Sequence, residues 1–468
     1  MTVKRESAKG YRRSKAMVAL RALGTASSGS MAVAQTFLVR LLVLGLNLLT
    51  GIVTARFLGP SGRAEQAAML IGIGLLPFLL SFGLPMAIQY TMRSDPERQD
   101  RLVSVATVLS FAFGIVCIAV SFVVLPRLVT KYSPFVLHLS ELLMLAAPFA
   151  ILYTVYCGVL QARSQFAEAN FTRYAMPLST LLALFGLVLA HRMTPLTTSI
   201  AYIMPYLWIV PWMWTQVRPK LTFRDFRATA SGLLTYGARS YVTDILGTMM
   251  AQIDQVLVIG LLSPVSMGIY AVAISAARVS DLFSGPIVTV LFPKASALPL
   301  GEIVELTGRA ARITFALLVL SLLLSVAALP FLLPAVYGHS FTGSTRVAQI
   351  LILSIVFNGT VYVLSQAFMA SGKPGIMAGI QVLGLSTTIP AMLVLVPRFG
   401  LVGAAASLVL SSILRLWMAL VCYPTILKQK MPSIILTLDD VRFLSATLKM
   451  RLGGEPFLHE ASKSRRAG

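Results

Sequence analysis

Long apolar segments alternate with short polar connections along most of the chain. A helix of about 20 mainly apolar residues can cross a hydrocarbon layer roughly 30 Å thick, and about twelve such segments can be recognised. The pattern predicts an all-α polytopic membrane protein. The segments lie near residues 31–55, 66–90, 102–126, 136–160, 173–191, 196–215, 241–262, 267–292, 311–337, 346–371, 375–396 and 401–425.

The composition agrees with this pattern. Hydrophobic residues make up 57% of the chain and charged residues 12%, whereas an average soluble domain has about 25% charged residues. This excludes a soluble enzyme, a disordered scaffold and a secreted disulfide module. Cys117, Cys157 and Cys422 lie in apolar segments without a C-x-x-C pair, so we expect them to be packing residues. The four histidines are scattered, and we expect no metal site.

The basic residues predict how the chain is oriented. The net charge is +22, and most lysines and arginines fall in the two tails and in the connections on the same side. The positive-inside rule therefore places both termini in the cytoplasm. The excess charge then reflects topology and contact with anionic lipids, and we expect no nucleic-acid partner. The opposite connections hold Arg56, Arg63, Arg127, Lys131, Arg192, Arg346 and Arg398.

Weak internal similarity suggests two halves of like topology. An offset of 204 residues carries Arg56–Pro60 onto Gly260–Pro264, and an offset of 208 carries residues 161–164 onto 369–372. Two like bundles that face each other would form a central cavity with alternating access; a shared bias towards Leu, Gly and Pro is the alternative explanation. The expected division is a basic cytoplasmic tail (1–30), an N-terminal six-helix lobe (31–215), a cytoplasmic linker (216–240), a C-terminal six-helix lobe (241–425) and a basic, partly amphipathic cytoplasmic tail (426–468).

Several short motifs resemble a known family. The segment Thr54–Gly62, with Leu84-Pro85 after it, is similar to the opening of polysaccharide-exporting membrane proteins. The segments Gln252–Gly260, Gly268–Ala273 and Leu291–Ser296 resemble the second half of Wzx-type polysaccharide and O-antigen flippases. These belong to the multidrug/oligosaccharidyl-lipid/polysaccharide exporter superfamily. The resemblance implies a V-shaped fold of two six-helix lobes and export of a sugar chain linked through pyrophosphate to a polyprenyl lipid.

Charged and amide side chains within the spans are the candidate cargo ligands. A charge inside the membrane costs about 2.5–3.5 kcal/mol on insertion scales, so it should face protein or a watery cavity. Arg40 lies in the first span with Asn47 on nearly the same face, and an arginine can hold pyrophosphate bidentately. The alternative is a structural ion pair between Arg40 and Asp244, its equivalent in the second half.

The second half offers further charged candidates. Asp254 could carry a proton or Na⁺ to couple transport, or it could brace the two lobes through an ion pair. Arg278 and Asp281 are three residues apart and could pair with each other, or Arg278 could face the cavity and bind cargo. Arg415 lies near a span end and is expected to extend towards the interface.

The leading hypothesis is therefore a flippase that moves a polyprenyl-pyrophosphate-linked oligosaccharide for cell-surface polysaccharide synthesis. We see no phosphate-binding glycine loop, so we expect no cofactor and coupling to H⁺, Na⁺ or the membrane potential. A polysaccharide polymerase is a possible partner. The alternatives are a multidrug/cation antiporter of the same superfamily, a non-transporting scaffold and, less favoured because the outer connections are short, a membrane-embedded glycosyltransferase.

Overall fold

The computed structural model describes residues 29–440 except 221, 223, 224, 283, 286, 289, 290, 292–294 and 297; it describes side chains from residue 38 onwards, except 96, 239, 240, 242–244, 281 and 282. Within these residues the chain is almost entirely helical, which confirms the predicted all-α fold. The α-helices are α2 (Gly29–Leu79), α3 (Leu84–Ser94), α4 (Gln99–Leu128), α5 (Pro134–Leu143), α6 (Ala147–Ala162), α7 (Phe166–Leu189), α8 (Pro195–Val217), α9 (Phe226–Leu261), α10 (Pro264–Ala277), α12 (Leu300–Tyr337), α13 (Ser344–Ala370) and α14 (Gly375–Cys422).

Two of these helices are long enough to cross a membrane twice. Among the described residues, seven helical stretches have the length and apolar composition of a membrane span, and two of them, Leu38–Ser94 and Gly375–Leu427, contain 57 and 53 residues. Both turn sharply at a glycine with positive φ, 66° at Gly59 and 57° at Gly400, a conformation that glycine adopts without a steric penalty. The two turns fall between predicted spans. The total of twelve spans and the six-plus-six division stay predictions.

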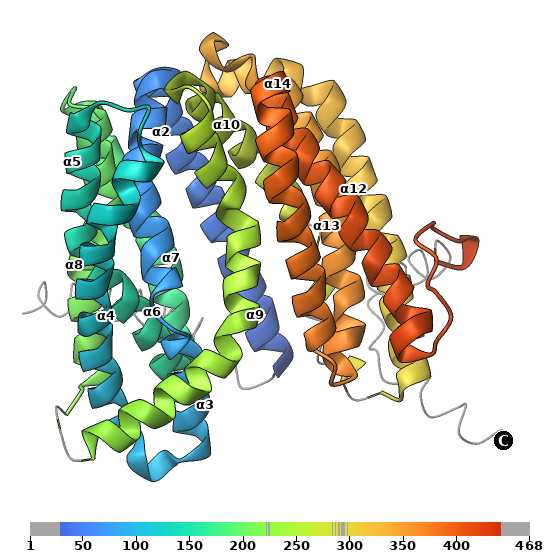
Figure 1. The fold of residues 1–468 in the computed structure, drawn as a ribbon, viewed down its shortest axis with the longest axis horizontal. Coiled ribbons are helices and arrows are strands. Elements are labelled where there is room, and N and C mark those ends of the chain that lie inside the picture. Colours follow the sequence, from blue (N-terminus) through green and yellow to red (C-terminus); the bar gives the residue numbers. More distant parts are fainter. Residues whose placement is uncertain are drawn as a thin grey trace, which may run out of the picture.

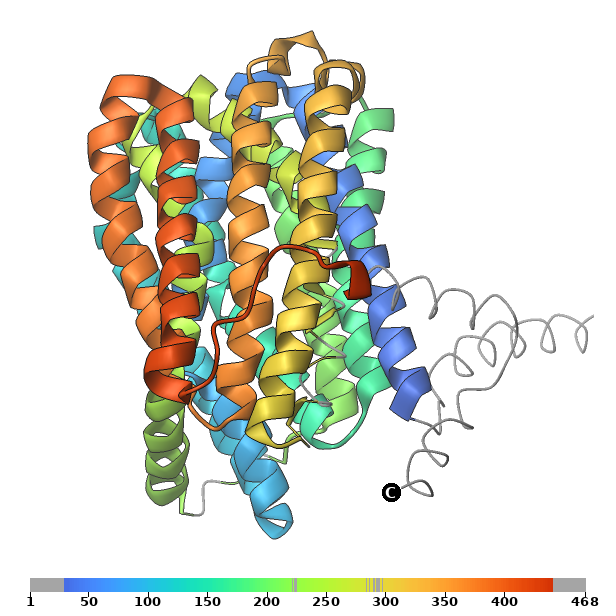
Figure 2. The same ribbon diagram turned by 90° about the vertical axis from the view of Figure 1, so that its right-hand side faces the viewer.

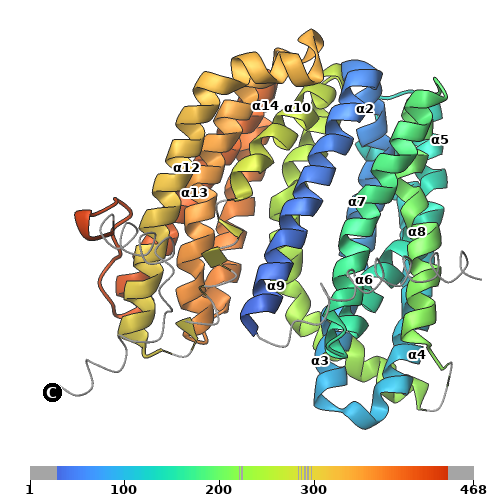
Figure 3. The same cartoon turned by 180° about the vertical axis from the view of Figure 1, so that it is seen from behind.

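The helices form two groups joined by α9 (Figure 1). Helices α2 to α8 pack together in the first group and α12, α13 and α14 in the second, while α10 packs against both α2 and α13. Helix α9 packs first on α3 and α4 and then on α14. The two groups draw together at the end that holds Gly59 and splay apart towards the opposite end (Figures 1 and 3). We call the first the turn end and the second, which holds Asp95–Arg98 and Lys220, the basic end.

Close backbone contacts hold the two groups together at the turn end. A Cβ atom on Gly268 of α10 would lie 1.9 Å from the carbonyl oxygen of Pro60 in α2, so α10 can approach this turn only because residue 268 has no side chain. Arg56 of α2 donates to the carbonyl oxygens of Ala335 and Val336 in α12, each at 3.5 Å. The turn end is therefore closed by direct packing of α2 on α10 and α12.

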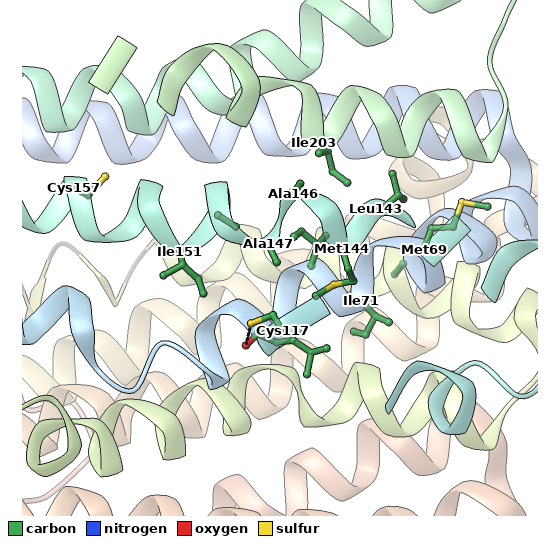
Figure 4. Close-up of a cluster of buried hydrophobic side chains, with 14 of the residues drawn as sticks. Met69, Ile71, Cys117, Leu143, Met144, Ala146, Ala147, Ile151, Cys157 and Ile203 are labelled. Carbon is green, nitrogen blue, oxygen red and sulfur yellow. Dashed lines mark hydrogen bonds between the residues drawn. The ribbon is translucent and has the colours of Figure 1, made fainter. Parts of the chain in front are cut away.

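The first group has a dense apolar core in which Cys117 and Cys157 are packing residues (Figure 4), and Cys422 packs in a second apolar cluster. All three cysteines are free and buried, and Cys117 lies among side chains that include Ile71 and Met144. Its thiol donates to the carbonyl oxygen of Leu76 at 3.6 Å. Burial in apolar surroundings disfavours the thiolate, which is the reactive form of a cysteine. These cysteines are therefore packing residues.

The connection between the two groups is shorter than the predicted linker 216–240. Helix α8 ends at Val217 and α9 begins at Phe226, so residues 226–240 are helical. This segment contains no proline, and it packs against the first group: Tyr236 stacks on Tyr90 with ring centroids 4.3 Å apart. Its charged residues resemble a loop in the sequence, but they belong to a helix that extends past the apolar span.

The C-terminal segment after α14 folds back over α12 and α13 (Figure 2). Asp440 is 1% exposed and accepts two hydrogen bonds from the Arg312 guanidinium, at 2.6 and 2.9 Å. Pro432 packs over Gly308, where a Cβ would come within 3.2 Å of the proline ring. We call residues 428–440 the C-terminal strap. The predicted amphipathic segment extends beyond Asp440 into residues 441–452, outside the described residues.

Substituting Asp440 by asparagine is expected to release the strap, because it removes the charged partner of Arg312. The Arg312 guanidinium holds the pKa of the Asp440 carboxyl well below its usual range. A carboxyl group whose pKa is lowered on docking stabilises the docked state fully at pH values above its ordinary pKa. This stabilisation is lost only as the pH falls through the lowered pKa. Protection of the Thr437 amide, which donates to Asp440 at 3.0 Å, from hydrogen exchange should therefore be constant from about pH 5 to 8 and fall in Asp440→Asn. Glu305→Gln, which changes an exposed acid on α12, should retain the protection.

Candidate binding cavity

Three adjoining cavities surround α9. The first, of about 430 Å³, is lined by α9, α10, α13 and α14, and we call it the α9–α14 cavity. The second, of about 240 Å³, lies between α2, α8, α9 and α10, and we call it the central cavity. The third, of about 620 Å³, is lined mainly by α2, α3, α6, α8 and α9. Gln255, Ile274 and Arg278 line both of the first two cavities, so the two are contiguous.

Arg278 stands at the junction of these cavities. It directly follows α10 as the C-cap residue and is exposed. Arg63 of α2, in the first helix group, lines the same central cavity. Its guanidinium donates to Gln66, and its buried Nε has no hydrogen-bond partner among the described residues. An arginine of the first group and an arginine at the end of α10 therefore share one small cavity, together with the hydroxyls and amides of Tyr202, Ser275, Gln252 and Gln255.

Asp254 lies in the wall of the α9–α14 cavity and is 7% exposed. Its Oδ2 accepts a hydrogen bond of 2.8 Å from the hydroxyl of Tyr270, a residue of α10 that is fully buried. Its Oδ1 is buried and has no partner in the part of the chain that the structure describes. A carboxylate with one satisfied oxygen and one open oxygen could accept a proton or contribute to a cation site.

Arg415 of α14 also faces the α9–α14 cavity and is 6% exposed. The expectation that it extends towards the interface is wrong. A Cβ on Gly384 would lie 2.7 Å from Cδ and 3.1 Å from Nε of Arg415, so the glycine leaves room for the arginine to lie between the two arms of α14. The buried Nε has no hydrogen-bond partner among the described residues, nor has Oε1 of Gln381 in the same wall.

The other predicted site residues are placed as follows. Arg40 and Asn47 are exposed on the first arm of α2 and do not line the three cavities described above. Their contact with cargo stays a prediction. The side chains of Asp244 and Asp281 lie outside the described residues, so the pairs Arg40–Asp244 and Arg278–Asp281 also stay predictions.

Sequence reasoning did not select Arg63. Hydropathy alone starts the second span near residue 66, whereas α2 resumes directly after Gly59 and already includes Arg63. The signal that could have identified it is the turn Gly59-Pro60, because a proline in the first turn of a helix marks where that helix begins. Arg63 then lies in that first turn, not in a connection.

The cavity walls carry more positive than negative charge. Of the described residues that line the three cavities, Arg63, Arg278 and Arg415 are basic and Asp254 is acidic. Amides and hydroxyls supply the remaining polar groups. No cluster of three His, Cys, Asp or Glu that could hold a metal ion occurs in the part of the chain that the structure describes. Arginines in a site of low dielectric attract anions strongly, so this arrangement suits an anionic, hydroxyl-rich ligand.

Solved structures share this fold over most of the chain. A lipid II flippase MurJ in an inward closed conformation matches with a TM-score of 0.70 at 15% identity, covering 90% of this chain and 92% of that one. A multidrug resistance MATE family transporter of the MOP superfamily matches in its inward-facing conformation with a TM-score of 0.71 at 13% identity, covering 83% and 96%. An outward-facing structure with the same description gives 0.57 at 15% identity, covering 83% and 94%.

A comparison with curated proteins finds no match. A family model described as "Polysaccharide biosynthesis protein" matches residues 53–346. The match covers more than half of the chain and includes Arg63, Asp254 and Arg278. The chain therefore belongs to the polysaccharide biosynthesis protein family, and it is a multi-pass membrane protein with the fold of the MOP superfamily.

Proposed function

We propose that this protein is a flippase that moves a polyprenyl-pyrophosphate-linked oligosaccharide from the cytoplasmic to the outer leaflet of a bacterial plasma membrane. The observation that carries the proposal is the central cavity, where Arg63 of the first helix group and Arg278 at the end of α10 line one space. A pyrophosphate offers several charged oxygens, and planar guanidinium groups bind such oxygens in bidentate pairs. The polyprenyl chain would remain in lipid while the headgroup passes through the protein.

The closed turn end supports an inward-facing arrangement. By the positive-inside rule the basic end is cytoplasmic. The contacts of Pro60 with Gly268 and of Arg56 with α12 would then close the outer side. Cargo would enter from the basic end, where the helix groups splay apart (Figure 3). Rocking of the groups about α9 would then open the turn end, as alternating access requires.

The membrane potential favours export of an anion. Moving one charge through 100 mV is worth about 2.3 kcal/mol, and an inside-negative potential drives anions outward. Coupling to H⁺ or Na⁺ is a further proposal, which rests on the open Oδ1 of Asp254.

Deleting the gene in its host tests the proposal. Loss of a surface polysaccharide with lipid-linked sugar units retained on the cytoplasmic side supports it. The multidrug/cation antiporter is favoured by one observation, the buried Asp254, but the three arginines in the cavity walls oppose a cationic cargo. Intact polysaccharide with increased sensitivity to cationic drugs would support the antiporter instead, and intact polysaccharide without such sensitivity would support a non-transporting scaffold.

Replacing Asp254 by asparagine separates ion coupling from structural bracing. If the carboxylate carries H⁺ or Na⁺, transport driven by an applied ion gradient should fall by about tenfold, the effect of roughly 1.4 kcal/mol, while exchange without a gradient continues. Tyr270→Phe, which removes the hydrogen bond to Oδ2 and retains the charge, should cause a smaller loss. Equal loss of both transport modes in a folded Asp254→Asn protein would indicate a structural role. Vesicles with imposed pH or Na⁺ gradients provide the measurement.

A further inference from the structure

The α9–α14 cavity contains a buried cation that the proposed pyrophosphate site does not use. Arg415 is 6% exposed, and its Nε has no hydrogen-bond partner in the described part of the chain. An isolated buried charge is costly, and an arginine cannot neutralise itself by losing a proton at physiological pH. The position is accommodated by Gly384, whose missing side chain gives the guanidinium stem its space. An anionic group in the cavity near Arg415 would therefore be strongly favoured.

The charged side chains that the structure describes in this wall do not supply that anionic group. Asp254 lines the cavity, but it makes no ion pair within 4.0 Å with Arg415, and one of its oxygens is held by Tyr270. Arg278 lines the same cavity, so the described residues of the wall include two cations and one anion. A visiting anion would complete the charge balance.

The volume of the α9–α14 cavity and its uncharged polar side chains indicate which kind of anion it would bind. The cavity volume of about 430 Å³ lies within the range of pockets that hold small organic molecules, about 300–1,000 Å³. It is much larger than the roughly 30 Å³ that one water molecule occupies in the liquid, so a monatomic ion would leave it mostly unfilled. Gln255, Gln381 and Asn358 line it, and amides can donate to and accept from sugar hydroxyls.

We propose that the α9–α14 cavity binds an acidic sugar of the cargo and that Arg415 recognises its carboxylate. This inference rests on the proposed function, because it assigns the pyrophosphate to Arg63 and Arg278. Arg278 and Gln255 line both cavities, so a headgroup with its pyrophosphate at Arg278 places the attached sugars next to the α9–α14 cavity. Arg415 then determines specificity: it favours cargo with a carboxylate-bearing sugar over the neutral equivalent.

Two cargoes that differ in one group test this inference. Purified protein is placed in proteoliposomes with polyprenyl-pyrophosphate-linked disaccharides that carry either a glucuronic acid or a glucose as the varied unit. The wild-type protein should move the acidic cargo about tenfold faster at subsaturating concentration, the scale of one hydrogen-bonded charge. Arg415→Gln should bring the two rates within about twofold of each other by slowing the acidic cargo alone. Arg398→Gln, which changes an exposed arginine outside the described cavities, should keep the wild-type preference.

Further variants keep the test decisive if Arg415→Gln does not fold. Gly384→Ala retains the arginine but places a Cβ 2.7 Å from its side chain, so it should also reduce the preference, while Arg415→Lys should retain part of it. Equal wild-type rates for the two cargoes would overturn the inference and leave the proposed function standing. Movement of neither cargo would overturn the proposed function itself. Loss of both cargoes in folded Arg415→Gln protein would assign the residue a structural role.

A ligand-binding experiment distinguishes recognition of a sugar carboxylate from binding of a free inorganic anion. Sodium glucuronate, glucose, sodium chloride and sodium phosphate are added separately to wild-type and Arg415→Gln protein, and thermal unfolding is followed in detergent. Glucuronate should raise the unfolding temperature of the wild type and leave that of Arg415→Gln unchanged. Stabilisation by chloride or phosphate equal to that by glucuronate would contradict a sugar site and point to a free anion.

Discussion

Substituting Arg278 by glutamine is expected to lower the rate of lipid-linked sugar transport by about 100-fold, which corresponds to roughly 2.7 kcal/mol. Arg278 lines both the central cavity and the α9–α14 cavity, so it lies on the proposed path of the pyrophosphate whichever cavity holds the sugars. Glutamine retains hydrogen-bonding groups and removes the charge. Because truncating one member of a desolvated charge pair commonly costs 2–5 kcal/mol, the expected loss is at the lower end of this range for an exposed side chain.

The matched comparison for Arg278 uses Arg63 and Arg398. Arg63→Gln should cause a loss of the same order, because Arg63 lines the central cavity opposite Arg278, whereas Arg398→Gln should retain transport. Initial rates in proteoliposomes provide the measurement, and the unfolding temperature in detergent confirms that each variant is folded. Transport within about twofold of wild type in a folded Arg278→Gln protein would remove this residue from the mechanism.

Placing a methyl group on Gly268 should open the turn end of the protein and lower transport by more than about tenfold. A Cβ at this position would lie 1.9 Å from the carbonyl oxygen of Pro60 and 2.7 Å from its carbon. The contact is with backbone, so no side-chain rotation can relieve it, and α10 must move away from α2. The closed state of the turn end is therefore destabilised relative to the open one.

Cross-linking with a flexible bifunctional thiol reagent reports this change directly. Arg56→Cys and Ala335→Cys introduce thiols on α2 and α12, which are in contact at the turn end through the long Arg56 side chain, so the reagent replaces the reach of that side chain, while the native cysteines are buried. Cross-linking should be efficient in an otherwise wild-type background and clearly reduced by Gly268→Ala. Gly260→Ala is the control, since a Cβ there has no atom within 4 Å. Equal cross-linking with and without Gly268→Ala would contradict the assigned role of this contact.

Hydropathy predicts the membrane fold of this chain well, for a physical reason. A lipid-exposed helix needs a long apolar segment whatever its neighbours are, so the spans are a local property of the sequence. Gly59-Pro60 and Ser263-Pro264 illustrate this, because each dipeptide lies between two predicted spans and a helix starts there in the structure. Hydropathy did not indicate that the basic connection after α8 is largely helical, because a helix that leaves the apolar segment can continue through charged residues when it packs on another helix group.

The cavity residues depend on which helices meet, and hydropathy carries no such information. The position of Arg415 along its span suggests that it extends towards the interface. Gly384, which precedes it by 31 residues, instead leaves room for its side chain inside the protein. Asp254 can be recognised in the sequence as a charge within an apolar segment, but its partner Tyr270 lies on another helix and cannot be found by spacing within α9. Arg63 was missed because its helix begins earlier than its apolar run.

The central claim is that this protein moves a pyrophosphate-linked sugar lipid across a membrane. The most direct measurement places purified protein in sealed vesicles with a polyprenyl-pyrophosphate-linked oligosaccharide and follows how much of it becomes accessible to an external glycosidase. The account predicts rapid appearance of the cargo with wild-type protein and appearance near the protein-free rate with Arg278→Gln. Appearance at the protein-free rate with folded wild-type protein, across both an imposed potential and imposed H⁺ or Na⁺ gradients, would contradict it.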